Sequence, residues 1–220
     1  MIVCNPLLNG ISLKELKGII FDCDGVLFDS KDVNKQFYND VRSYFDLPPM
    51  SADQEDYVHI HSVLASFKHI LPRGFEKELP AIKEKLDYSK FLPYMKMEDG
   101  LIELMEFLAG KPVRSGINTN RTTTMSLLLN TFGLENYFHP VVTAADVSRP
   151  KPHPESLFKI LDHWSLRPHE VVFIGDSIVD QEAAAGAGVP FWSFKNEQLN
   201  GRMLIPDFWT LRSFLMHNLP

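Results

Sequence analysis

Cysteine is scarce in this sequence, which has only Cys4 and Cys23, and this scarcity excludes a fold held together by a disulfide network. Two free thiols in a reducing compartment are the simpler interpretation. The opening residues MIVCNPLLNG lack the basic start and long apolar centre of a secretory signal peptide. Apolar runs of the roughly 20 residues that span a bilayer are also missing. We therefore expect a cytoplasmic protein with no membrane partner.

Basic clusters are absent as well, since the formal net charge is −6 and no stripe of lysine and arginine occurs along the chain. This argues against a nucleic-acid partner, although a few local cations could still bind an anionic substrate. Hydrophobic residues make up 45% of the 220 residues, which is ample for a core. The length suits one large domain or a core with a smaller inserted unit, and it leaves monomer and homodimer open.

Residues 32–95 have the pattern of helices alone, because apolar residues recur there at helical spacing and no strand pattern interrupts them. Ser51 and Gln54 have the spacing of a capping box, which predicts the start of a long helix that ends at Pro72. A third, weaker helical pattern covers about 76–90. The region is thus predicted to be a small all-helical unit.

The rest of the chain alternates between strand and helix patterns. The apolar run 18–22 predicts a buried strand before the helical unit, and strands and helices alternate again after Pro93. This alternation predicts a parallel sheet with right-handed crossovers. The expected fold is therefore α/β, a Rossmann-like parallel-sheet core made of residues 1–31 and 96–220. The helical unit, residues 32–95, is an insertion after the first core strand.

Ligands of open parallel sheets bind at the carboxyl ends of the strands, so the residues that follow each predicted strand indicate the site. The first strand ends in two carboxylates separated by one residue, and later strands or loops supply a hydroxyl, an amide, a lysine and two more acids. These residues are Asp22, Asp24, Thr119, Asn120, Lys151, Asp176 and Asp180. If the fold is right, all of them converge on one edge of the sheet.

The chemistry of this set points to phosphoryl transfer. Crowded carboxylates repel one another unless a cation neutralises them, and a donor set of oxygens without histidine or cysteine suits Mg²⁺. A lysine beside acids suits an anion such as phosphate. One carboxylate could accept the phosphoryl group, and a second one two residues away could transfer the proton. We therefore expect a Mg²⁺-dependent phosphatase that acts on a small phosphorylated metabolite.

Four segments, taken together, resemble a known family. FDCDGVLFDS, NTNR, RPKPHPE and GDSIVDQEAA resemble, in this order, the four motifs of phosphatase-type members of the haloacid dehalogenase superfamily. The helical insert resembles the cap of the branch that contains phosphoglycolate phosphatase and β-phosphoglucomutase. Dehalogenating members lack an acid at the position of Asp24, so halide removal is disfavoured.

The resemblance also implies roles for the residues that match the motifs. Asp22 would be the nucleophile that forms an aspartyl-phosphate, and Asp24 the general acid and base. Thr119, Asn120 and Lys151 would bind the phosphoryl group, and Lys151 would also take part in catalysis by steadying the nucleophile. Asp22, the backbone carbonyl of Asp24, and Asp176 would hold Mg²⁺, with Asp180 orienting water ligands or Lys151.

Other functions stay open at this stage. A phosphomutase of the same superfamily would need a cap that holds a bisphosphorylated sugar. A phosphonatase would need a cap lysine for a Schiff base, and Lys68 is the only placement that we consider for it. A phospho-acceptor signalling protein gathers similar residues, but such domains are shorter and lack a helical insert.

Several further polar residues near the motifs have simpler interpretations. Asp29 is expected at a hinge or helix start, and Cys23 is expected to pack as an inert thiol. Arg121 could contact substrate or cover the surface. Arg73, a loop arginine of the cap, is a weak candidate for substrate contact, and Arg149 beside Lys151 could add positive charge. The cap histidines are expected to be solvated or half-buried, and they are His59, His61 and His69.

Overall fold

The computed structural model describes residues 3–4, 13–78, 81–82 and 88–219. Its main sheet has seven strands in the order β1-β9-β8-β7-β2-β5-β6. The strands are β1 Val3–Cys4, β2 Gly18–Phe21, β5 Arg114–Asn118, β6 Val141–Val142, β7 Val171–Gly175, β8 Phe191–Phe194 and β9 Met203–Ile205. All neighbours are parallel except β1, which runs antiparallel to β9 at the sheet edge.

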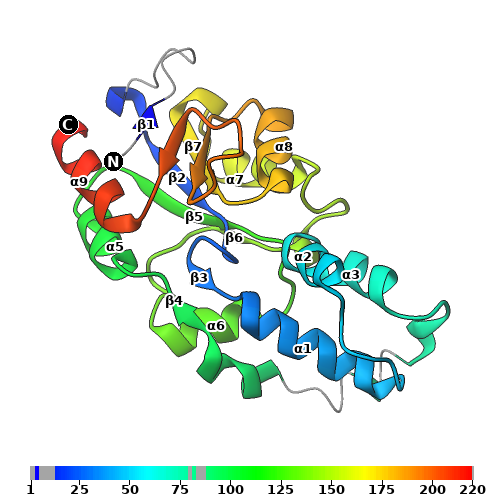
Figure 1. Ribbon diagram of the computed structural model, residues 1–220. Coiled ribbons are helices and arrows are strands. Elements are labelled where there is room, and N and C mark those ends of the chain that lie inside the picture. The colour runs from blue at the N-terminus through cyan, green and yellow to red at the C-terminus, as the bar shows by residue number, and fades with distance from the viewer. Residues whose placement is uncertain (1–2, 5–12, 79–80, 83–87, 220) are drawn as a thin grey trace.

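Helices cover both faces of this sheet (Figure 1). Alternate residues of β2 show why, since Ile19 and Phe21 pack into one apolar cluster and Ile20 into another. The first cluster contains residues of α5 (Leu101–Ala109), α6 (Met125–Phe132) and α9 (Phe208–Asn218), and the second those of α7 (Glu155–Trp164) and α8 (Ile178–Ala187). The chain therefore has an α/β fold with a parallel sheet buried on both faces, as the sequence predicts.

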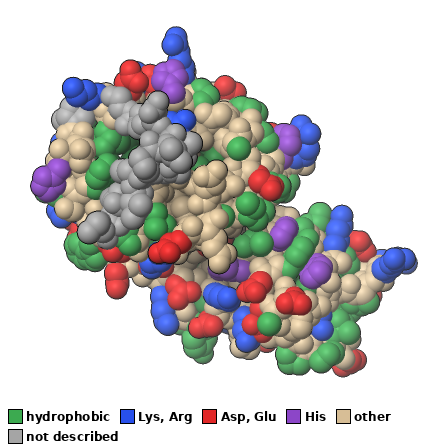
Figure 2. Space-filling view, turned by 45° about the horizontal axis from the view of Figure 1, so that its top comes forward, with side chains coloured by type: hydrophobic (Ala, Val, Ile, Leu, Met, Phe, Trp, Pro, Cys, Tyr) green, Lys and Arg blue, Asp and Glu red, His purple; other side chains and the backbone are tan. Residues whose placement is uncertain are grey.

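A second body of helices follows β2 in the chain. It contains α1 (Lys31–Tyr44), α2 (Ala52–Ile60), α3 (Val63–Ile70) and the 3₁₀ helices η2 (Phe75–Lys77) and η3 (Tyr88–Tyr94). Buried residues such as Tyr38, Val58 and Phe67 form an apolar cluster of its own. Figure 1 shows this smaller body beside the sheet, and the space-filling view of Figure 2 shows a notch in the molecular outline between a larger and a smaller part. Its limits as a cap domain, residues 32 and 95, stay a prediction.

A short two-stranded ribbon joins the two bodies. Strand β3 (Phe28–Asp29) leaves the core just before α1, and β4 (Lys96–Met97) returns to it just after η3. The two strands pair antiparallel, which places the outgoing and returning connections side by side. The remaining short elements are the 3₁₀ helices η1 Leu13–Glu15, η4 Ala144–Asp146 and η5 Pro168–Glu170.

The prediction of one long second helix in the insert is wrong, because the structure has two helices there. The capping box of Ser51 and Gln54 is present and starts α2. That helix ends at Ile60, His61 is extended, and the Ser62 hydroxyl accepts a hydrogen bond from the N–H of Ala65 to start α3. A serine that caps a new helix competes with continuation of the old one. Part of the predicted helical stretch 76–90, and the side chain of Cys4, lie outside the described residues.

Among the helices that the structure describes, none is both long and apolar enough to cross a bilayer.

Candidate active site

Three neighbouring strands bring the predicted site residues together. Phe21 at the end of β2 lies opposite Ile117 of β5 and Ile174 of β7 in the sheet register. The residues that follow these strands, Asp22, Thr119 and Asp176, therefore emerge at the same carboxyl edge. Asp22 and Thr119 are buried, with 6% and 2% of their surface exposed. The sheet topology thus produces the convergence that the sequence predicts.

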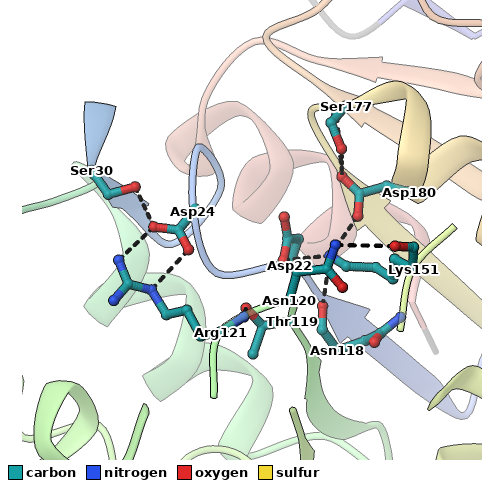
Figure 3. A network of polar contacts seen from close by, with 10 residues as sticks. All are labelled: Asp22, Asp24, Ser30, Asn118, Thr119, Asn120, Arg121, Lys151, Ser177 and Asp180. Carbon is teal, nitrogen blue, oxygen red and sulfur yellow. Dashed lines mark hydrogen bonds and ion pairs between the residues drawn. The ribbon is translucent and has the colours of Figure 1, made fainter. Parts of the chain in front are cut away.

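Lys151 connects two of the carboxylates (Figure 3). Its Nζ lies 2.7 Å from Oδ1 of Asp22 and 2.6 Å from Oδ1 of Asp180, and it donates to the carbonyl of Asn118 at 3.1 Å. The other oxygen of Asp180, Oδ2, accepts from the N–H and the hydroxyl of Ser177 at the start of α8. Asp180 therefore fixes the position of Lys151, and Lys151 fixes the position of Asp22.

The carboxylates of this cluster carry strongly shifted pKa values. Burial, followed by repulsion from Asp180, raises the pKa of Asp22 to about 7, although Lys151 opposes the shift. Burial and the same neighbour, Asp180, raise the pKa of Asp176 well above its usual range. Burial acts against the charge of Lys151, but the attraction of Asp180 and Asp22 is larger and raises its pKa. Negative charge is therefore in excess at this edge of the sheet.

Such an excess fits a bound cation. One carboxylate oxygen from each of Asp22, Asp176 and Asp180 lies within 4.8 Å of the others. Both oxygens of Asp180 are already engaged by Lys151 and Ser177, so Asp22 and Asp176 are the residues with oxygens to offer. Hard oxygen ligands with no histidine or cysteine among them suit Mg²⁺. The residues present therefore fit the predicted ion.

Gly25 makes room for Asp176. Its φ is +76°, and a Cβ at this position would lie 2.0 Å from Oδ2 of Asp176. A side chain would therefore clash with the carboxylate as well as strain the backbone. The N–H of Gly25 donates to the carbonyl of Phe28 at 2.8 Å, which closes the turn between the site and the ribbon.

Asp24 takes part in a second network, on the other side of the turn. Arg121 binds both of its oxygens, with Nη2 2.6 Å from Oδ1 and Nε 2.8 Å from Oδ2. Nη1 of Arg121 donates to the hydroxyl of Tyr88 at 2.7 Å, and Ser30 donates its hydroxyl to Oδ1 of Asp24. Figure 3 shows Arg121 and Ser30 on the far side of Asp24 from Lys151. These contacts join Asp24 and Arg121 of the core to Ser30, just before α1, and to Tyr88, at the start of η3.

Arg121 is only 6% exposed, so the interpretation that it covers the surface is wrong. The sequence offers one weak signal for its role, a positive residue directly after the NTN segment that ends β5. The sequence does not predict the roles of Ser30 and Tyr88, because an isolated hydroxyl outside the motifs has no distinguishing pattern.

A cavity of about 430 Å³ lies between the core and the helical body. Six of the predicted site residues line it: Asp22, Asp24, Thr119, Asn120, Lys151 and Asp176. Asp180 lies behind Lys151. The opposite wall comes from α1, α2 and α3, and includes Phe37, Val58 and Phe67. The volume lies within the roughly 300–1,000 Å³ of small-molecule sites.

The family model described as haloacid dehalogenase-like hydrolase matches residues 19–194. The chain belongs to this family. A solved hydrolase of the same superfamily from Geobacter sulfurreducens is 34% identical, with a TM-score of 0.77, and the alignment covers 91% of this chain and all of the other.

Two further proteins are similar to this hydrolase. A phosphorylated carbohydrates phosphatase from Thermotoga maritima is 27% identical over 183 residues, which cover 79% of this chain and 82% of the relative. The structure of a β-phosphoglucomutase from Clostridium difficile matches with a TM-score of 0.81 at 16% identity, covering 93% of this chain and 97% of the other. At that identity the likeness shows the fold alone.

The other residues singled out in the sequence lie partly in the cavity wall, partly in the core and partly on the surface of the hydrolase. Both His59 and His61 line the cavity. Two side chains at this spacing on one helix would face different sides, but α2 ends at Ile60, so His61 does not continue the helix. Cys23 is fully buried in the core, which confirms its packing role, and burial raises the pKa of its thiol. The remaining candidates are exposed and lie outside the cavity lining: Asp29, Lys68, His69, Arg73 and Arg149.

The raised pKa of Asp22 predicts how the stability of the metal-free hydrolase depends on pH. A carboxyl that binds its proton more tightly when folded stabilises the protein at low pH, and this contribution is lost as pH rises from about 4 through the folded value of about 7. In EDTA we expect the Tm of the wild type to fall between pH 6 and pH 8 by several degrees more than that of Asp22→Asn. An equal or smaller fall in the wild type would contradict the shift.

Proposed function

We propose that this protein is a phosphatase that hydrolyses the phosphate monoester of a small metabolite through an aspartyl-phosphate on Asp22. The observation that carries the proposal is the buried Asp22 carboxylate, held by Lys151 at 2.7 Å at the base of the cavity. Family membership and the phosphatase name of the Thermotoga relative support the reaction class. The scarcity of cysteine and the buried thiol of Cys23 support the cytoplasm as the compartment.

Mg²⁺ would be held by Asp22, Asp176 and the backbone carbonyl of Asp24. When bound, the ion supplies positive charge that neutralises the carboxylates and polarises the phosphoryl group. The protein residues then have separate tasks. Thr119, Asn120 and Lys151 bind the phosphoryl oxygens, and Asp180 keeps Lys151 in place through the contact of 2.6 Å.

In the first step an Asp22 oxygen attacks phosphorus, the bond from phosphorus to the leaving oxygen breaks, and Asp24 donates a proton to that oxygen. In the second step the Asp24 carboxylate takes a proton from a water molecule as this attacks phosphorus, which frees phosphate and restores Asp22. The reaction is thus divided into two easier displacements, and the same two carboxylates, Asp22 and Asp24, act in both.

The second step needs Asp24 as a carboxylate, and the surroundings of Asp24 favour that form. Burial would raise the pKa of Asp24, but attraction and hydrogen bonds from Arg121, with help from Ser30, lower it overall. Asp24 is therefore an ionised carboxylate in this arrangement. Because Arg121 engages both of its oxygens, these contacts favour the carboxylate over the protonated acid that the first step needs.

The helical body, residues 32–95, would act as a cap that closes over the cavity. Its apolar wall, including Phe37 and Val58, would exclude bulk water during phosphoryl transfer. The Asp24–Arg121 contact joins the core to the helical body, since Ser30 directly precedes α1 and Tyr88 begins η3.

Release of phosphate from p-nitrophenyl phosphate and acetyl phosphate tests the proposal. With Mg²⁺ we expect many turnovers per protein molecule, loss of activity in excess EDTA, and recovery when Mg²⁺ is restored. Asp22→Asn should lose this activity, whereas Asp29→Asn, an exposed acid outside the carboxylate cluster, is the matched control and should keep it. One stoichiometric phosphorylation without release would indicate a phospho-acceptor instead, and sugar-phosphate isomerisation without net release would indicate a mutase.

A further inference from the structure

Both cations of the cavity wall are already paired with carboxylates. Among the described residues that line the cavity, Lys151 and Arg121 are the cations, and Asp22, Asp24 and Asp176 are the acids. Lys151 contacts Asp22 and Asp180, and Arg121 binds Asp24 through two nitrogens. Within this part of the chain, no cationic side chain of the lining is left to bind a second negative group on a substrate.

The rest of the described wall offers uncharged hydrogen-bonding groups beside apolar surface. Thr122, Thr123 and Thr124 follow Arg121 and all line the cavity, as do Tyr88 and Asn34. Hydroxyl and amide groups of this kind bind the hydroxyls of a ligand well, but they compensate poorly for the desolvation of a carboxylate or phosphate.

Among the described residues of the helical body that line the cavity, His59 has a buried side-chain nitrogen without a partner. It lines the cavity from the last turn of α2, and its Nδ1 is buried without a hydrogen bond to any described residue. Nearly all buried polar atoms of folded proteins have a partner, so this atom is an exception to be explained. Burial lowers the pKa of His59, against the attraction of Asp24, and a neutral imidazole nitrogen can donate to or accept from a hydroxyl.

On the basis of the proposed phosphatase function, we infer that the substrate is the phosphate monoester of an uncharged, hydroxyl-bearing alcohol, and that His59 hydrogen-bonds a hydroxyl of this leaving group. A carboxylate or second phosphate on the leaving group would lie close to Asp24 with no free cation of the described wall to bind it. Like charges at such close range are strongly unfavourable in a buried site.

The preference of the protein among phosphorylated compounds tests the inferred substrate class. The wild-type protein with Mg²⁺ is given glucose 6-phosphate and glycerol 3-phosphate as uncharged leaving groups, 2-phosphoglycolate and pyrophosphate as charged ones, and acetyl phosphate as a small reference. We expect kcat/KM for the better polyol phosphate to exceed that for either charged substrate by about tenfold or more. The reverse order would overturn the inference. If the charged substrates are hydrolysed as fast as the polyol phosphates, or are the only ones hydrolysed, the leaving-group assignment fails while the phosphatase stands. Hydrolysis of no substrate at all overturns the phosphatase itself.

Variants of His59 test the residue. In His59→Leu we expect the ratio of kcat/KM for the polyol phosphate to that for acetyl phosphate to fall about tenfold or more, since the hydroxyl that His59 binds on the leaving group loses its partner. The ratio is measured on one preparation, so it does not depend on the fraction of folded protein. His59→Asn, whose amide can reach the position of Nδ1, should restore most of the ratio. His69→Leu, an exposed cap histidine outside the cavity, is the control. An unchanged ratio in His59→Leu would overturn the assignment.

Discussion

Lys151→Met is expected to lower kcat by on the order of 10³-fold or more and to lower the Tm by roughly 10 °C. The ammonium is buried between Asp22 and Asp180, with contacts of 2.7 Å and 2.6 Å. Its removal leaves two buried carboxylates without their cation, which typically destabilises a protein by about 3–5 kcal/mol. Differential scanning calorimetry and phosphate release measure the two effects on the same preparation.

A second substitution separates the two effects of Lys151. In Lys151→Met with Asp180→Asn the number of uncompensated charges falls, so the Tm should recover in part. The activity should not recover, because no cation then binds the phosphoryl group. Lys68→Met, an exposed lysine of α3, is the matched control and should change neither quantity. A Lys151→Met protein with wild-type kcat would show that the lysine is structural only.

Asp22→Asn is expected to abolish turnover, with a loss on the order of 10⁴-fold, and to leave the fold intact. The amide has nearly the same shape as the carboxylate but cannot act as the nucleophile. Lys151 keeps Asp180 and the carbonyl of Asn118 as partners, so no buried cation is left alone. Because burial disfavours the ionised form of Asp22, the metal-free variant should unfold at pH 8 no more easily than the wild type.

The contrast with Asp24→Asn makes this prediction specific. That variant keeps the nucleophile, so it should lose the proton-transfer contribution alone, about 10²–10⁴-fold for poor leaving groups. If Asp22→Asn retained more activity than Asp24→Asn on an alkyl phosphate, the assignment of the nucleophile would be wrong.

The core of the site could be predicted from the sequence because it depends on chain topology. Once the strands are parallel, residues that directly follow them must meet at one edge, and this holds for Asp22, Thr119 and Asp176 regardless of side-chain detail. The burial of Cys23 likewise follows from its place between two residues that face the site. Local pattern and sheet topology were sufficient for these residues.

The second network could not be predicted, because it depends on how loops fold back. Asp24 and Arg121 are 97 positions apart, and their contact needs a long side chain to lie along the turn rather than in solvent. The position of His61 was missed for a related reason. Apolar residues at Ile60 and Leu64 continue the helical spacing across Ser62, so periodicity alone does not reveal that α2 ends there.

The most direct test of the account is to trap the phosphorylated protein. Asp24→Asn is mixed with Mg²⁺ and acetyl phosphate, a substrate with a good leaving group, and is quenched in acid for peptide mass spectrometry. Because this variant lacks the base of the second step, we expect one phosphoryl group per molecule, on the peptide that contains Asp22, and none after Asp22→Asn is added to the same chain. Phosphorylation at another residue, or turnover with no phosphorylated protein at any time, would contradict the proposed role of Asp22.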